Sequence, residues 1–196
     1  MAVEWTEHRF SGGALALDTA NTVVMRGDPR GFDRFADEAE IARFAAAASR
    51  FRRDELDGLT LDVPEPVLSA PIVLELREAI DALFRADAAG ARRPGGALPR
   101  LLRACADALD GADDGAGGGD RPEAVPFLAA VAHSALALLP ERKSGRIRIC
   151  GNCGWLFVDR SRNASRRWCD MAVCGNRRKA RRHYQRHRTG AEKDHA

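Results

Sequence analysis

The chain has 196 residues, of which 45% are hydrophobic and 30% are charged. This length suits one ordinary domain with a small additional module, and the hydrophobic content is sufficient for a core, which excludes a largely disordered protein. No apolar run approaches the roughly 20 residues that a membrane-spanning helix requires, and the first residues do not resemble a secretory signal. We therefore expect a cytoplasmic protein without a membrane-spanning segment.

The formal net charge of +3 conceals an uneven distribution. Between Cys150 and Arg188, eleven basic residues stand against two aspartates, whereas residues 1–149 carry more acidic than basic side chains. Such asymmetry indicates two parts with different roles. We expect an acidic body over residues 1–141 and a basic module over residues 146–190, joined by a short hinge.

The body is predicted to be mostly helical. Apolar residues recur at helical spacing in four stretches, which are 32–51, 71–90, 98–111 and 122–139. Asp33 is the expected N-cap of the first helix, and Pro71 the expected start of the second. The last helix is expected to open at Pro122 or Glu123, after a glycine-rich loop at 112–123.

Four of the five cysteines lie in two close pairs near the C-terminus, with the spacing C-x2-C, fifteen residues, C-x4-C. They are Cys150, Cys153, Cys169 and Cys174. Such pairs favour a metal site over free thiols, a redox pair or disulfides in a reducing compartment. His183 and His187 are alternative ligands, but the four sulfurs already complete a closed site. We expect one structural Zn²⁺.

Short strands are predicted at 146–150 and 155–159, on either side of the first cysteine pair, and a helix follows the second pair. The module is therefore predicted to be treble-clef-like, with the order strand, turn, strand, helix. The expected fold class of the chain is mostly α, or α+β overall once these strands are included.

Basic residues around the cysteines are candidate contacts to nucleic acid. They are Arg160, Arg162, Arg166, Arg167, Arg177, Arg178, Lys179, Arg181 and Arg182. Guanidinium groups pair with phosphates, and those on the final helix share one broad face. Duplex DNA is favoured over RNA, because Trp155, Phe157 and Trp168 are expected to pack around the metal instead of stacking on bases. The alternative is a solvated basic tail without a partner.

The body offers a weaker candidate site. Asp18 and Asn21 lie one turn apart if residues 15–24 are helical, and Arg77 lies within an apolar helix. These residues could bind an unknown small ligand, or bond to neighbouring backbone and side chains, which is the favoured alternative. No Ser-His-Asp, Cys-His or paired-carboxylate arrangement has useful spacing, so we do not expect an enzyme.

The stretch CGNCGWLFVDRSRNASRRWCDMAVCGNRRKARRHYQR (150–186) resembles the CGNR zinc-finger family, whose motif stands here at residues 174–177. The body is more weakly similar to the ABATE domain of bacterial stress-induced transcription regulators, through LALDTANTV (15–23) and LREAIDALF (76–84). The resemblance implies DNA binding by the finger and ligand sensing by the body. Two other functions remain open: a zinc-scaffolded protein-interaction adaptor, and a small-molecule sensor or enzyme without a role in nucleic-acid binding.

Overall fold

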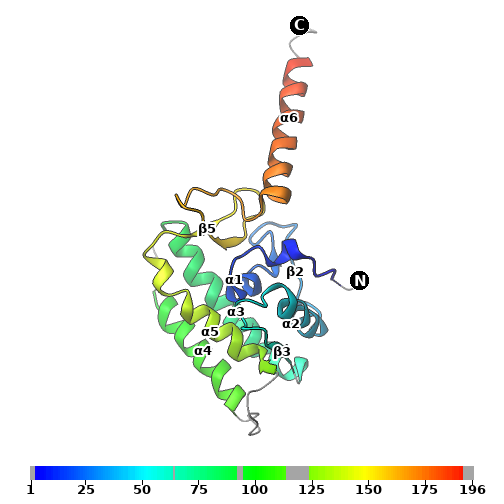
Figure 1. Ribbon diagram of the computed structural model, residues 1–196. Coiled ribbons are helices and arrows are strands. Elements are labelled where there is room, and N and C mark those ends of the chain that lie inside the picture. Colours follow the sequence, from blue (N-terminus) through cyan, green and yellow to red (C-terminus); the bar gives the residue numbers. More distant parts are fainter. Residues whose placement is uncertain (1–2, 64, 92–94, 114–123, 192–196) are drawn as a thin grey trace.

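The computed structural model describes residues 3–63, 65–91, 95–113 and 124–191. Figure 1 shows the helices of the body gathered on one side of a small hairpin module, and a final helix that extends away from the body. The expected fold class, a helical body followed by a small module with strands, is confirmed.

The body begins with a short 3-10 turn, η1 (Glu7–Phe10), and its helices follow in chain order. They are α1 (Leu15–Ala20), α2 (Ala39–Phe51), α3 (Pro66–Ala88), α4 (Ala97–Asp113) and α5 (Phe127–Ala137). Two strand pairs connect them: β1 (Val23–Val24) with β2 (Phe32–Asp33), antiparallel, and β3 (Thr60–Asp62) with β4 (Ala124–Pro126), parallel. A second 3-10 turn, η2 (Pro140–Arg142), ends the body.

The module contains an antiparallel hairpin, a π-turn and a helix. These elements are β5 (Ile147–Ile149), β6 (Leu156–Val158), η3 (Met171–Gly175) and α6 (Asn176–Ala191). The predicted order of strand, turn, strand and helix is therefore present.

Three predicted helix starts were wrong. Helix α3 begins at Pro66, which suits a first position because the amides there lack a partner within the helix, so Pro71 lies inside it. Ala70 and Val73, on either side of Pro71, are buried in the core. Helix α2 begins at Ala39 because Asp33 pairs in β2, where its carboxylate accepts the amide of Phe35 instead of capping the helix.

The third error concerns α5, which begins at Phe127 instead of Pro122 or Glu123. Strand β4 takes up the preceding residues, because its backbone pairs with β3 and because Val125 precedes a proline and so disfavours the helical conformation. The predicted loop at 112–123 falls mostly outside the described residues, and residues 112–113 belong to the end of α4.

One hydrophobic core runs through the body and into the hairpin of the module. Large side chains such as Phe44, Phe84 and Phe127 are almost fully buried in it. Leu156 and Val158 of β6 belong to the same cluster. Burial of two such side chains is worth about 1.5–3 kcal/mol each, so the hairpin is docked firmly on the body.

Backbone and side-chain hydrogen bonds complete this joint. The Asn21 amide at the end of α1 donates to the Leu156 carbonyl and accepts from the Leu156 amide, both at 2.8 Å. The Val158 amide donates to the Gly12 carbonyl, also at 2.8 Å. Gly12 is in turn held by Asp18, whose carboxylate accepts the Gly12 amide at 2.8 Å. A Cβ on Gly12 would lie 2.6 Å from that carboxylate, so glycine is required there.

We expect Asn21→Ala to lower the free energy of unfolding by roughly 2–4 kcal/mol, because the buried amide and carbonyl of Leu156 would both lose their partner. Asn163→Ala is the matched control: Asn163 is exposed, and its loss should change stability by no more than about 0.5 kcal/mol. Urea unfolding measures both variants. Equal losses would show that the bonds between Asn21 and Leu156 do not hold the joint.

Candidate metal centre and nucleic-acid interface

The four paired cysteines converge at the end of the β5–β6 hairpin. Their sulfur atoms all lie within 4.8 Å of one another, and Cys169 Sγ is 3.6 Å from Cys153 Sγ and 3.7 Å from Cys174 Sγ. Two thiolates bound tetrahedrally to zinc at about 2.3 Å lie about 3.8 Å apart. The donor set and its spacing therefore fit one Zn²⁺ with all four positions filled.

Backbone geometry explains how the first pair is brought together. The Cys150 amide donates to the Trp155 carbonyl and the Gly154 amide to the Cys150 carbonyl, which closes the turn. Gly154 has a φ of +74°, a conformation that favours glycine. Gly151 lies against the Trp168 ring, so that a Cβ there would come within 3.0 Å of it.

The second pair is shaped by Asp170. Its carboxylate accepts the amides of Ala172 and Val173 at 2.7 and 3.2 Å, and so starts the η3 turn between Cys169 and Cys174. Gly175 follows, with the Met171 thioether packed against its open side. Helix α6 then begins at Asn176, whose side chain donates to the Ala172 carbonyl at 2.9 Å.

The thiols of the cluster are coupled through hydrogen bonds. Hydrogen bonds from Cys153 and Cys169 hold the pKa of Cys150 below its ordinary value, whereas the hydrogen bond with Cys150 and burial raise the pKa values of Cys153 and Cys169. A thiolate is the form of cysteine that binds Zn²⁺.

Aromatic side chains surround the sulfurs, as predicted. Trp155, Phe157 and Trp168 pack with the cysteines in a second, smaller cluster. Along β6 the side chains alternate, so Phe157 faces the sulfurs while its two neighbours face the body. These aromatic residues are therefore part of the core of the finger.

Two body residues that sequence reasoning missed also touch this shell. The His8 ring stacks on Trp155, and its Nδ1 lies 2.8 Å from Asp170 Oδ2. The Arg34 guanidinium lies 5.3 Å from the Trp155 ring and is only 9% exposed. Burial, and after it the charge of Arg9, lower the pKa of Arg34 to about 10. Arg34 thus places a positive charge beside the cysteine cluster. No local sequence pattern could have linked His8 and Arg34 to the finger, because their partners lie far along the chain.

The predicted nucleic-acid residues divide into two groups. All five on α6 are exposed: Arg177, Arg178, Lys179, Arg181 and Arg182. Helix α6 packs chiefly against η3 and extends away from the body (Figure 1). Its basic side chains therefore lie open to a partner.

The four loop residues differ from one another. Arg160, Arg162 and Arg167 are exposed, and the Arg167 guanidinium lies 5.4 Å from the Trp168 ring. Arg166 instead donates to the Cys169 carbonyl at 2.5 Å, with its guanidinium 5.3 Å from the Phe157 ring, and Arg160 donates to the Gly13 carbonyl of the body at 3.3 Å.

Asp159 organises this loop, a role that was not predicted from the sequence. It is fully buried and accepts the Ser161 hydroxyl at 2.6 Å and the Arg166 amide at 2.7 Å. Burial opposes its charge, but these hydrogen bonds prevail and keep the pKa of Asp159 below its ordinary value. The ionised carboxylate therefore folds residues 159–166 into a tight loop.

The three predicted ligand residues are all buried, and their polar groups have partners within the chain. Asp18 and Asn21 form the joint described above. Burial raises the pKa of Asp18 to about 6, even though Arg52 opposes the shift through a 2.5 Å hydrogen bond. These contacts match the structural alternative weighed from the sequence, and a ligand at these residues stays a prediction.

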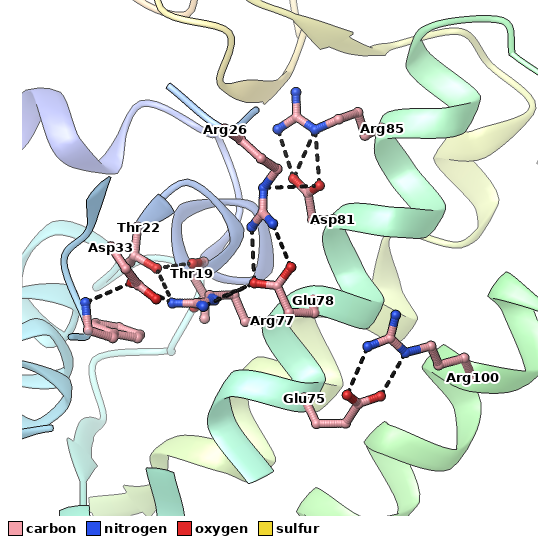
Figure 2. Close-up of polar contacts among 11 residues, drawn as sticks. Thr19, Thr22, Arg26, Asp33, Glu75, Arg77, Glu78, Asp81, Arg85 and Arg100 are labelled. Atoms are coloured by element: carbon pink, nitrogen blue, oxygen red, sulfur yellow. Dashed lines mark hydrogen bonds and ion pairs between the residues drawn. The ribbon is translucent and has the colours of Figure 1, made fainter. Parts of the chain in front are cut away.

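Arg77 belongs to a charged network along α3. Figure 2 shows it between Asp33, at 2.7 Å, and Glu78, at 3.0 Å. Beyond Glu78 the network continues through Arg26 and Asp81 to Arg85. The Arg85 guanidinium donates to the Gly154 carbonyl at 2.8 Å. The network therefore reaches from the body to the turn that carries the first cysteine pair.

Together, the fold and the cluster define a helical domain followed by a four-cysteine zinc finger. The family model of the CGNR zinc finger matches residues 146–187, and the ABATE model, described as "Putative stress-induced transcription regulator", matches residues 13–141. The second match covers more than half of the chain, which therefore belongs to the ABATE family, and its finger holds one structural zinc.

Neither of these two families is a family of enzymes. Comparisons with curated proteins and with solved structures found no match. In the part of the chain that the structure describes, every helix is too short or too polar to cross a membrane.

We expect the purified protein to contain one zinc per chain, and chelation to remove hydrogen-exchange protection around Cys150–Cys153 and Cys169–Cys174. Leu156 and Val158 should keep most of their protection, because their amides bond to Asn21 and Gly12 of the body. Metal analysis with exchange mass spectrometry measures both effects. Loss of protection over all of residues 146–190 with an intact body would instead support a finger that folds as a separate domain.

Proposed function

We propose that this protein is a bacterial transcription regulator that binds duplex DNA through α6 and the adjoining loop of its zinc finger. The observation that carries the proposal is the uncompensated charge of α6, which holds seven basic residues and no acidic one. The family description points to the same role.

The charge on α6 is costly in the free protein. Arg177 and Arg181, like Arg178 and Arg182, lie four residues apart, and like charges at this spacing destabilise a helix. The side chains from Arg177 to Arg182 are all exposed, so burial does not offset the repulsion. Phosphates would neutralise these charges and release counterions, which favours binding.

The shape of the finger suits the same partner. An α-helix fits the major groove of B-DNA, and 16 residues span about 24 Å. Arg162 and Arg167 are exposed on the loop that precedes η3 and could contact the adjacent backbone. The zinc would set the direction of the helix, because Cys174 stands two residues before its first residue.

We further propose that the body senses a small ligand and influences the finger through the β6 joint. The shared core and the network from Arg77 to Gly154 support this coupling, because a change in the body would reach the cysteine turn.

Replacing Arg178, Arg181 and Arg182 with alanine should make the salt dependence of DNA binding shallower by nearly three units, at about 0.9 per lost phosphate contact. Zinc content should not change, and stability should not fall, because the substitutions remove the repulsion between like charges along α6. Fluorescence anisotropy with a duplex of mixed sequence, over a range of salt concentrations, measures the slope. Arg30→Ala, Arg103→Ala and Lys143→Ala together remove the same charge from exposed positions on the body and form the control. An unchanged slope in the α6 variant would favour a protein-interaction adaptor.

The structure also separates the two neighbouring loop arginines. Arg166→Ala should speed the release of zinc to a chelator, because the Cys169 carbonyl and the Phe157 ring would lose their contact. The Arg167 guanidinium lies 5.4 Å from the Trp168 ring but its side chain bonds to no cysteine, so Arg167→Ala should speed zinc release less than Arg166→Ala and make the salt slope shallower by about 0.9. The reverse pattern would make Arg166 the phosphate contact.

A further inference from the structure

A cavity of about 720 Å³ lies where the body meets the finger. It is lined by the residues before α1, the turn that follows α2, the end of α5, and Arg160, which comes two residues after β6. This volume is in the range of small-molecule sites, and the cavity is distinct from both the cysteine cluster and α6. Because both family segments contribute to its wall, a molecule bound here would contact the body and the finger together.

The polar groups on one wall of the cavity are fixed by the fold. Ser134 is 7% exposed, and its hydroxyl donates to Glu55 at 2.5 Å while accepting the Ala16 amide at 3.0 Å. Glu55 also accepts the Leu15 amide, and Arg52 is held by Asp18. These groups are already partnered, so they give the cavity its shape and do not supply its free charge.

Three other arginines supply that charge. Arg50, Arg53 and Arg160 line the cavity, and among the described residues none of them forms an ion pair. The Arg50 guanidinium lies over the Phe51 ring at 4.4 Å. The 3.3 Å bond from Arg160 to the Gly13 carbonyl uses one of its donors and leaves the others for a ligand.

Two acidic residues, Asp54 and Glu141, also line the cavity, and Glu141 accepts the Ser144 hydroxyl at 2.8 Å. Among the described residues, these three arginines and two acidic residues form no ion pair, so cations exceed anions by one in this part of the wall. The remaining wall is apolar and includes Phe51 and Leu138. A negative group beside an apolar part is the ligand chemistry that complements such a wall.

We propose that this cavity binds a small organic anion, with its carboxylate or phosphate between Arg53 and Arg160 and its apolar part against Phe51 and Leu138. The proposal rests on the proposed sensing role of the body and does not depend on DNA binding. It also gives Arg160 a different role from the DNA contact predicted from the sequence. Arg160 leads into the loop folded by Asp159, so the bound anion would connect the body to the segment that carries Cys169.

The test uses the full zinc-loaded chain without DNA, and two probes that present each anionic group on one phenyl ring: benzoate and phenyl phosphate. Thermal unfolding and backbone NMR shifts are measured at matched ionic strength and pH, with probe concentrations up to about 10 mM. At that concentration a ligand with a Kd near 1 mM is mostly bound. We expect one probe to raise Tm and to shift the amides of Gly13, Arg53 and Arg160. The probe that binds more tightly identifies the anionic group.

The variant Arg53→Ala with Arg160→Ala should weaken the binding at least about tenfold, because both charge-assisted contacts would be lost. Arg30→Ala with Arg103→Ala removes the same charge from exposed positions outside the cavity and should bind as the parent does. Binding that is unchanged in the Arg53/Arg160 variant would place the ligand elsewhere, which overturns this cavity but retains a sensing body. If neither probe shifts these amides in the parent, the anion site is wrong, whatever the outcome of the DNA assay.

Discussion

Strand β6 contributes side chains to two hydrophobic clusters, the core of the body and the core of the finger, so the arrangement of the whole molecule depends on the register of this strand. Its outer residues, Leu156 and Val158, enter the core of the body, while Phe157 between them faces the sulfur atoms. The period-two alternation of a strand permits this division, and a register shift of one residue would reverse it. The bonds from Asn21 and Gly12 fix the register, because each pairs with one amide of the strand.

This constraint gives the buried polar residues of the first helix a clear physical role. Asp18 is kept charged at a cost in desolvation, which shows in its raised pKa, and it is stabilised by Arg52 and by the Gly12 amide. A neutral apolar residue at this position could not hold Gly12 in place. The interior charges of the joint are thus matched within the chain, whereas the basic residues from Arg177 to Arg182 on α6 form no ion pair with the described part of the chain. That contrast is the physical reason why we propose an external partner for α6 and not for the joint.

Local patterns were sufficient to predict the cysteine cluster, the hairpin around it and most of the helices. Cysteine spacing is informative because both ligands of a pair lie on one short turn. The helical spacing of apolar residues in α3 is informative because it indicates one buried face. The parallel pairing of β3 with β4 was missed because its residues are about 64 positions apart. The partners of Asn21 and His8 are 135 and 162 positions away, so no local pattern could identify them. The polar interruption at Asp18 and Asn21 was visible in the sequence, but its meaning depended on a strand at the other end of the chain.

The geometry of α6 explains why such a joint is needed. A helix of 16 residues is about 24 Å long, so a rotation of about 10° at its base would move its far end by about 4 Å, more than the tolerance of a hydrogen bond. The position of its base is set by η3, which follows Cys169 and contains Cys174. The N-cap residue of η3, Asp170, contacts His8 of the body. The zinc site fixes the helix relative to the hairpin, and β6 fixes the hairpin relative to the body. Each of these two connections is too local to orient α6 alone, so the direction of the basic helix depends on both.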